Sequence, residues 1–359
     1  MAVVEILPES TVHTHLTFAN ILGPLAGKRA GVPVVVTLHN ESFNPRLVNR
    51  LRRWLETHSL RYGATRIIAV GHAVEQSQRS RFPRTKMEII PNAVTPVPAI
   101  SPTERLALRA TIVGNVIGTT VPPGTTVPPG TTVPPGTTVP PGTTVPPGTT
   151  VPPRPMLISV GRLSRQKAFA DLITAFTTVR QKYPTAVLVI VGGGQTRAEL
   201  VAQIQSLGLE GHVFLLGFRN DVPALLAASD LFVSSSHWEG IPIAILEAMS
   251  AGLPVVATEV GDVPLIVNEA SGFIVPPAQP MRLADAITTL LADPDQRRKM
   301  GAAARLHVLQ NYSPEVWAGK LCDLYLEVKS QFRSCYVHPG QVPPLPCFGD
   351  SAQSESAGQ

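Results

Sequence analysis

Hydrophobic positions follow two periods along the second half of this chain. Short runs rich in β-branched residues alternate with segments in which apolar residues recur every three or four positions. The runs predict buried strands and the segments predict amphipathic helices. The predicted strands are PMLISVG at 155, AVLVIVGGG at 186, HVFLLG at 212, LFVSSS at 231, PVVATE at 254 and GFIV at 272. Such alternation is typical of a parallel α/β sheet with crossover helices.

The first half shows the same alternation more thinly. The runs TVHTHL, PVVVTLH, RIIAVG and MEIIP predict about four strands within fewer than 100 residues. This half therefore predicts a second, shorter Rossmann-like domain.

One predicted helix in the first half, over residues 45–61, is unusually basic. Its apolar residues stand at helical spacing, and they are Leu47, Val48, Leu51, Trp54 and Leu55. The surrounding arginines are Arg46, Arg50, Arg52, Arg53 and Arg61. Two interpretations fit this pattern. The helix either lays its apolar stripe on the sheet, or lies at an interface with anionic lipid.

Between the two halves the motif VPPGTT repeats over residues 118–153. Paired prolines remove backbone donors and favour polyproline II, so this stretch predicts a solvated spacer. The pattern divides the chain into an N-terminal domain, a connecting segment, the spacer, a second domain, a final helix that crosses back, and a disordered tail. Their predicted bounds are 1–98, 99–117, 118–153, 154–312, 313–333 and 334–359.

Charge and composition limit the classes of ligand and the location of this protein only partly. Residues 1–115 hold 14 Lys or Arg against 7 Asp or Glu, so a basic surface is expected there. Nucleic acid, anionic lipid and phosphorylated small molecules all suit such a surface. The apolar runs are shorter than the roughly 20 residues that span a bilayer, and the start lacks a basic leader, so a cytoplasmic protein is expected. The cysteines Cys322, Cys335 and Cys347 are too few and too poorly spaced for a metal site.

Candidate chemistry lies in loops that follow predicted strands, because ligands of open parallel sheets bind at the carboxyl ends of the strands. In SVGRLSRQKAF, Arg162 and Lys167 follow a strand and precede a helix, which suits a diphosphate or is simply a solvated loop. In VIVGGGQ, Gly193 and its neighbours either admit a ligand close to the backbone or make a tight turn.

The stretch SHWEGIPIAILEAMSAG carries two glutamates with seven residues between them. Glu239 is expected in a loop and Glu247 about two turns into the following helix. The amides of residues 240–243 would form an anion-binding helix start. Two carboxylates beside one site could each accept hydrogen bonds from vicinal sugar hydroxyls, for instance of a hexose and a ribose.

Together GRLSRQKAFADLITAF, LVIVGGGQ, the E-x7-E stretch and SGFIVPP resemble the donor-binding half of retaining, nucleotide-sugar-dependent glycosyltransferases of family 4, which have the GT-B fold. The resemblance covers most of residues 155–312. It implies an α/β fold of two Rossmann-like domains facing across a cleft.

The resemblance also implies roles for single residues. Arg162 and Lys167 would hold the donor diphosphate, and Glu239 with the amides of Gly240 to Ile243 would hold the transferred sugar. Glu247 would bind the nucleotide ribose. The remaining donor-binding residues would be Gly193, Phe218, Arg219, Gly240, Ile241, Pro242 and Ile243, with the base received near Phe218 and Arg219. Ala168 stands where the family usually has glycine, and its extra methyl group is expected to cause little trouble.

The first half resembles the same family more loosely, through VHTHLTFANILGPLAGKRAGVPVVVTLHN, IIAVG and EIIPNAV. His39 matches a histidine that contacts the reacting sugars, and Asn92 closes the last strand. The family's first strand and glycine-rich loop have no counterpart after Met1, so the first domain is expected to be incomplete.

These observations predict a retaining, hexosyl-type glycosyltransferase that needs neither metal nor cofactor. The expected partners are a nucleotide-sugar donor and a sugar, lipid or small-molecule acceptor, together with an anionic membrane contact through residues 45–61 and no nucleic acid. One alternative is a catalytically impaired relative that binds a nucleotide or a partner protein. Another is a phosphorylase or sugar-nucleotide epimerase on the same fold.

Overall fold

The computed structural model describes residues 10–39, 47–83, 85–117 and 154–335, which form two compact units. Of these described residues, those from 10 to 92 and from 315 to 335 belong to the first unit, and those from 93 to 314 belong to the second. The predicted spacer at 118–153 lies outside the described residues, as does the predicted tail from residue 336 onward. Residues 334 and 335, predicted to begin that tail, belong instead to the last helix.

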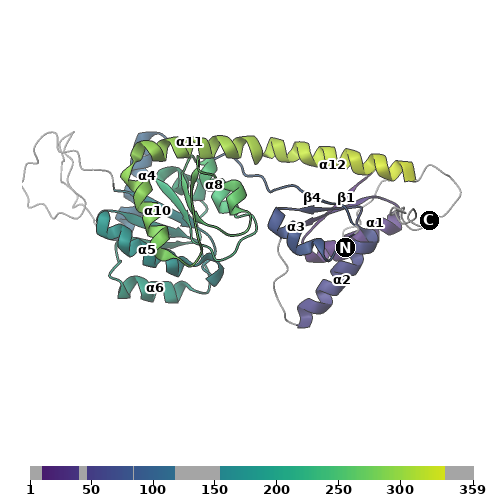
Figure 1. Ribbon diagram of the computed structural model, residues 1–359, viewed down its shortest axis with the longest axis horizontal. Coiled ribbons are helices and arrows are strands. Elements are labelled where there is room, and N and C mark those ends of the chain that lie inside the picture. Colours follow the sequence, from purple (N-terminus) through teal and green to yellow (C-terminus); the bar gives the residue numbers. More distant parts are fainter. Residues whose placement is uncertain (1–9, 40–46, 84, 118–153, 336–359) are drawn as a thin grey trace, which may run out of the picture. The chain divides into compact units, whose positions relative to one another are not determined.

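The first unit is built on a parallel sheet in the order β1-β2-β3-β4, and these strands correspond to the four predicted from the sequence. Its elements are β1 (Val12–His15), α1 (Thr17–Ala30), β2 (Val34–Leu38), α2 (Leu47–Gly63), β3 (Arg66–Ala69), α3 (His72–Arg79), β4 (Met87–Ile89) and α12 (Pro314–Cys335). Figure 1 shows α1, α2 and α3 on one face of this sheet and α12 on the other.

The two faces of β2 explain this layering. Val34 and Val36 belong to a core cluster with Leu60 of α2. Val35 points to the opposite face and packs with Leu321 of α12. Successive side chains of a strand alternate between faces, so a strand such as β2 that is buried at every position is covered on both sides.

Helix α2 does not lay its apolar stripe on the sheet, so that interpretation of residues 45–61 is wrong. Trp54 and Leu51 are 60% and 63% exposed. The buried side of the helix carries Glu56, Ser59 and Leu60 instead. Small and polar side chains let α2 approach α1 closely: the Ser59 hydroxyl donates to the carbonyl of Ile21 at 2.5 Å.

A buried ion pair also holds this side of α2. Arg81 Nη2 donates to Glu56 Oε2 at 3.0 Å, and both side chains are close to fully buried. Desolvation outweighs the influence of Glu56 and lowers the pKa of Arg81. A buried carboxylate needs such a partner, which fixes the rotation of α2 about its axis.

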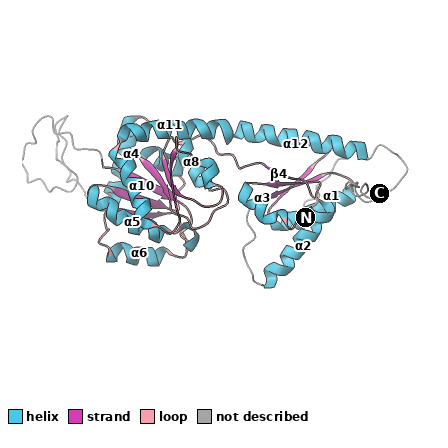
Figure 2. Ribbon diagram, in the orientation of Figure 1, coloured by secondary structure: helices cyan, strands magenta, loops and turns pink. Residues whose placement is uncertain are grey.

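The second unit has a parallel six-stranded sheet in the order β10-β9-β8-β5-β6-β7, with helices on both faces (Figure 2). Its strands are β5 (Met156–Val160), β6 (Val187–Val191), β7 (Val213–Gly217), β8 (Leu231–Ser234), β9 (Val255–Thr258) and β10 (Gly272–Val275). Its helices are α4 (Pro102–Ile117), the 3-10 turn η1 (Arg165–Lys167), α5 (Phe169–Lys182), α6 (Arg197–Ser206), α7 (Val222–Ala228), α8 (Ile243–Ser250), α9 (Val263–Ile266), α10 (Pro280–Ala292) and α11 (Pro294–Asn311). All six predicted strands are present.

The predicted connecting segment 99–117 largely forms helix α4, which belongs to the second unit. Arg105 and Arg109 both donate to the carboxylate of Asp230, just before β8. Ile112 is buried in the same core as β5 and β8. Within the described residues, no helix is long and apolar enough to cross a membrane.

The close approach of α1 and α2 yields a stability prediction. A methyl group on Gly63 would collide with the carbonyl of Pro24, whereas one on Gly319 of α12 would meet nothing within 4 Å. Gly63→Ala should therefore lower the free energy of unfolding by roughly 1–3 kcal/mol through overpacking. Gly319→Ala, the matched control, should raise it by up to about 1 kcal/mol. Urea unfolding of both variants measures the difference, and an equal response of the two would contradict the helix contact described above.

Candidate active site

The glycine-rich loop after β6 lies against the loop after β5. Leu163 N–H donates to the carbonyl of Gly193 at 2.9 Å. Gly192 has φ +137°, and a Cβ there would collide with the carbonyl of Gly161. A Cβ on Gly193 would collide with the ring of Phe218. The glycines thus allow three loops to meet at the carboxyl edge of the sheet, which favours the tight-turn interpretation and leaves close ligand approach open.

The centre of this edge is an ion pair between Lys167 and Glu239. Lys167 Nζ lies 2.5 Å from Glu239 Oε1. The same oxygen accepts a hydrogen bond from the Ser236 hydroxyl at 2.6 Å. Gln166 Nε2 donates to the Trp238 carbonyl at 3.0 Å and approaches the second carboxylate oxygen at 3.4 Å. Glu239 is only 7% exposed, so its charge is compensated and its position is fixed.

Arg162 differs from Lys167 although the sequence assigned both to one role. Its side chain is exposed, and no partner for it occurs among the described residues. Lys167, in contrast, is already engaged with Glu239. The two cations therefore have different surroundings: Arg162 has no partner among the described residues, whereas Lys167 holds the Glu239 carboxylate in place.

Ala168 is a correction to the sequence analysis. It has φ +47° and ψ +40°, the left-handed conformation, at the junction of η1 and α5. For a residue with a Cβ this conformation costs about 1–2 kcal/mol, so the methyl group is not a neutral addition. Phe169 and Leu172, which follow Ala168 in α5, are buried in the hydrophobic core and hold the junction of η1 and α5 in place.

Residues 240–242 form the loop that leads into α8, and Ile243 is the first residue of that helix. Pro242 is the N-cap and has no N–H, so the donors of the predicted nest come from Gly240, Ile241 and Ile243. In the part of the chain that the structure describes, no acceptor pairs with the amides of Gly240 and Ile241. Gly261, at φ +51°, sits so close to the Glu239 carbonyl that only glycine fits. The loop is thereby held with free N–H groups at a helix start, a geometry that suits anions.

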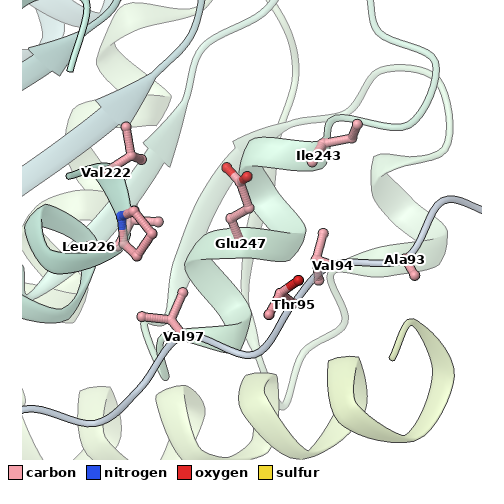
Figure 3. Close-up of a pocket in the computed structure, with 9 residues that line it drawn as sticks. Ala93, Val94, Thr95, Val97, Val222, Leu226, Ile243 and Glu247 are labelled. Carbon is pink, nitrogen blue, oxygen red and sulfur yellow. The ribbon is translucent and has the colours of Figure 1, made fainter. Parts of the chain in front are cut away.

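Glu247 lies one turn into α8, not two, because the helix begins at Ile243. It lines a cavity of about 280 Å³. Figure 3 shows its side chain projecting from α8 with the carboxylate pointing away from Thr95 and Val97. The other lining residues are Ala93, Val94, Thr95, Val97, Val222, Pro223, Leu226 and Ile243. Burial raises the pKa of Glu247, and no partner for its carboxylate occurs among the described residues.

The predicted base-binding residues lie on the loop after β7. Phe218 is 87% exposed. Arg219 is bound in a fork to Asp221, with Nε donating at 2.8 Å and Nη2 at 2.6 Å, and this contact raises the pKa of Arg219. An exposed ring on a loop that is braced by its own ion pair can stack on a flat ligand.

His39, the remaining predicted site residue, belongs to the first unit and is part of a histidine cluster. Its Nε2 lies 3.1 Å from Nδ1 of His15. The ring of His15 lies 4.2 Å from that of His13, centroid to centroid. His13 in turn contacts the Thr37 hydroxyl at 2.7 Å and the Tyr325 hydroxyl at 2.5 Å.

The sequence analysis missed His13 and His15. Their signal was the alternate spacing in VHTH, which places both side chains on the α12-facing side of β1, in register with Val35 and Thr37. Burial lowers the pKa of all three histidines, and that of His13 falls to about 4. At neutral pH the cluster therefore consists of uncharged, hydrogen-bonding imidazoles.

Two family models match this chain. Glycosyl transferases group 1 matches residues 147–307, and Glycosyltransferase Family 4 matches residues 10–97. The second of these ranges contains the strands of the first sheet, and the first contains the strands of the second sheet. The chain belongs to the group 1 glycosyltransferases of the GT-B fold.

Relatives of this chain are named for several different transfer reactions. An Escherichia coli protein named UDP-Gal:alpha-D-GlcNAc-diphosphoundecaprenol alpha-1,3-galactosyltransferase is 32% identical over 74% of this chain and 62% of its own length. The alpha-D-kanosaminyltransferase of Streptomyces kanamyceticus is 32% identical over 49% of this chain and 46% of its own length. The chain thus spans about half to three fifths of the length of these two relatives.

Solved structures support the same fold. Anabaena HepE in complex with UDP has a TM-score of 0.67 at 23% identity, over 90% of this chain and 77% of its own. Sucrose-phosphate synthase from Thermosynechococcus elongatus has a TM-score of 0.69 at 20% identity, over 89% of this chain and 74% of its own. At these identities the likeness shows the fold alone.

The different environments of the two cations predict different stability effects. Lys167→Ala leaves Glu239 buried without its counter-ion, so it should lower the free energy of unfolding by roughly 2 kcal/mol or more. Arg162→Ala, its matched control, should leave stability unchanged because that side chain is exposed. Adding Glu239→Gln to the Lys167 variant should restore part of the loss. Chemical unfolding of these variants and of Glu239→Gln alone tests this, and an additive double mutant would mean that the two side chains are not coupled.

The raised pKa of Glu247 predicts a pH-dependent stability effect. Above pH 4.5, the ordinary pKa of a glutamate, the unfolded chain releases a proton from Glu247 that the folded chain still retains. Glu247 therefore lowers the free energy of unfolding as the pH rises above that value. Glu247→Gln should therefore raise the melting temperature at pH 7, and the gain should vanish below about pH 4.5. Glu269→Gln, an exposed control in the same unit, should change neither. Melting curves from pH 4 to 8 decide, and a Glu247 variant less stable than wild type at pH 7 would refute the buried-charge account.

Proposed function

We propose that this chain transfers a hexose from a nucleotide diphosphate donor to an acceptor hydroxyl with retention of configuration. The observation that supports this best is the fixed Glu239 carboxylate, held by Lys167 beside the free N–H groups at the start of α8. The chain's likeness to relatives with glycosyltransferase names supports the reaction class.

The donor diphosphate would bind Arg162, Lys167 and the amides of Gly240, Ile241 and Ile243. Arg162 has its full charge available, while Lys167 has three N–H donors and can serve a phosphate oxygen in addition to Glu239. These groups supply positive potential where negative charge develops on the leaving diphosphate. The proposed reaction therefore needs neither a metal ion nor a cofactor.

The two glutamates would divide the donor between them. Glu239, with fixed geometry and a compensated charge, would accept hydrogen bonds from the hydroxyls of the transferred sugar. Glu247 would accept from the ribose hydroxyls, and these bonds would offset the cost of its partly buried charge. The base would lie against Phe218 and Arg219.

Retention follows if the acceptor attacks from the face that the diphosphate leaves. The acceptor hydroxyl would pass its proton to a phosphate oxygen, so that Glu239 orients the sugar without becoming the nucleophile. A contact of His39 with the reacting sugar stays a prediction. Its uncharged imidazole could donate or accept a hydrogen bond there.

Names of relatives suggest the class of acceptor. The Escherichia coli relative is named for a diphosphoundecaprenol acceptor. A Mycobacterium tuberculosis relative, 34% identical over 47% of this chain, is named for phosphatidylinositol monomannoside. We therefore propose a lipid-linked acceptor and a peripheral anionic membrane contact through residues 45–61. The cytoplasmic location remains a prediction from the sequence.

Incubating the full chain with UDP- and GDP-linked hexoses and acceptor lipids tests the function. One donor should release its nucleoside diphosphate, in the presence of EDTA as well, and the product's anomeric configuration by NMR should match the donor's. Glu239→Gln should slow transfer by roughly 10²-fold and still bind the bare nucleoside diphosphate. Arg162→Ala and Glu247→Gln should weaken that binding itself.

Each unexpected result of this assay would contradict a different part of the proposed function. An inverted product would overturn retention, and loss of activity in EDTA would overturn metal independence. Binding of UDP or GDP without release from any donor would favour the alternative of a catalytically impaired relative. Release of a sugar phosphate, or isomerised donor, would favour the phosphorylase or the epimerase.

A further inference from the structure

Helices α1 and α2 expose large apolar side chains on the side that faces away from the sheet. The residues are Phe18, Leu22 and Leu25 of α1 and Leu51, Trp54 and Tyr62 of α2, each between 49% and 69% exposed. We call these six residues the outer face. Both helices lie on the same side of the first sheet (Figure 1). Large apolar side chains that are exposed on one side of two packed helices are typical of an interaction site.

The exposure follows from how the inner sides of these helices are built. Helix α1 buries Asn20, Pro24 and Gly27. A Cβ on Gly27 would collide with Val34 of β2, so α1 lies directly on the sheet with no room for larger residues. At 100° per residue, positions 18, 22 and 25 lie opposite this buried strip. Because the buried strip of α1 faces the sheet, Phe18, Leu22 and Leu25 point away from the sheet, as the exposed apolar side chains of α2 do.

Aromatic and cationic groups join the two helices across the outer face. The ring of Trp54 stacks on His58 at 5.5 Å, and His58 lies 4.5 Å from Tyr62. The guanidinium of Arg52 lies 4.6 Å from the centre of the Phe18 ring. These contacts hold the aromatic rings at the surface in a fixed arrangement. Tryptophan and tyrosine with flanking cations are typical of the boundary between lipid headgroups and acyl chains.

Charge decides which partner suits this surface. The described residues of α1 and α2 include the cations Lys28, Arg29, Arg50, Arg52, Arg53 and Arg61. Their one acidic residue, Glu56, is buried and paired with Arg81. A second copy of this chain would bring like charges together, which disfavours self-association through this face. A bilayer with anionic lipids complements the outer face, because it offers an apolar interior beneath negatively charged headgroups.

We propose that the outer face docks on a bilayer that contains anionic lipids. The apolar side chains would enter the boundary between headgroups and acyl chains, and the basic side chains would lie at the level of the lipid phosphates. This extends the contact predicted for residues 45–61 to a surface made by two helices, with Phe18, Leu22 and Leu25 as its second half. Docking is a property of the first unit and does not require that transfer occurs.

Sedimentation with vesicles tests the proposal on the full chain. The vesicles are phosphatidylcholine alone, or phosphatidylcholine mixed with phosphatidylglycerol. Wild type should bind the mixed vesicles, and binding should weaken as salt increases. Removing two charges with Arg50→Gln and Arg53→Gln should weaken it roughly 30-fold, at about 1 kcal/mol per basic side chain. The matched control, Lys182→Gln with Lys299→Gln, removes two exposed charges from the second unit and should bind as wild type does.

Substitutions of Trp54 test insertion separately from charge. Tryptophan fluorescence should shift to the blue on binding. Trp54→Phe should keep binding and lose the shift, and Trp54→Ser should lose binding as well. Trp317→Phe, outside the outer face, should keep both. Melting curves verify that each variant is folded, and the charge variants provide an independent test if Trp54→Ser unfolds.

Several outcomes would overturn the proposal. Failure of wild type to bind mixed vesicles, or equal binding by the charge variants and their control, would do so. Unchanged binding by a folded Trp54→Ser would show electrostatic adhesion without insertion. A change in oligomeric state caused by the outer-face variants in size-exclusion chromatography would identify a protein interface instead. Because UDP or GDP binding to the same variants is measured in parallel, docking and the proposed reaction can fail independently.

Discussion

The arrangement of the second unit depends on burying one carboxylate, that of Glu239. A carboxylate that is 7% exposed requires a counter-charge and hydrogen-bond donors, which come from Lys167 on one loop and Ser236 on another. Meeting this requirement ties the end of β5 to the end of β8. The backbone also comes close at Gly261, where a Cβ would collide with the carbonyl of Glu239. The free N–H groups at the start of α8 are one result of this closure.

The two glutamates of the E-x7-E stretch show how environment separates similar groups. Glu239 is compensated within the protein, and its geometry is set before any ligand arrives. Glu247 faces a cavity, has no partner among the described residues, and has a raised pKa because burial disfavours its charge. A group that costs stability in the free protein and can be satisfied by ligand hydroxyls is suited to binding.

The first unit shows the opposite use of burial. Its helices place small and polar residues against the sheet and against one another, as Gly27, Ser59 and Gly63 illustrate. Larger apolar side chains are then left on the outside, together with most of the cations of these helices. The buried pair of Glu56 and Arg81 fixes this orientation, because rotating α2 to bury Trp54 would expose Leu60 and break that pair.

The sequence by itself determined the fold class, the ten strands and the candidate donor residues, because local periods and short motifs report the type of each element and the loops that follow strands. It did not determine which side of α2 is buried, since a stripe at helical spacing does not specify what lies beneath it. Nor did it reveal that Lys167 pairs with Glu239 or that His15 contacts His39. The extra methyl group of Ala168 was expected to cause little trouble, because the type of a residue does not reveal that its backbone adopts a left-handed φ. Such features arise from strand order and from close approach between segments far apart in sequence, and only the tertiary structure decides them.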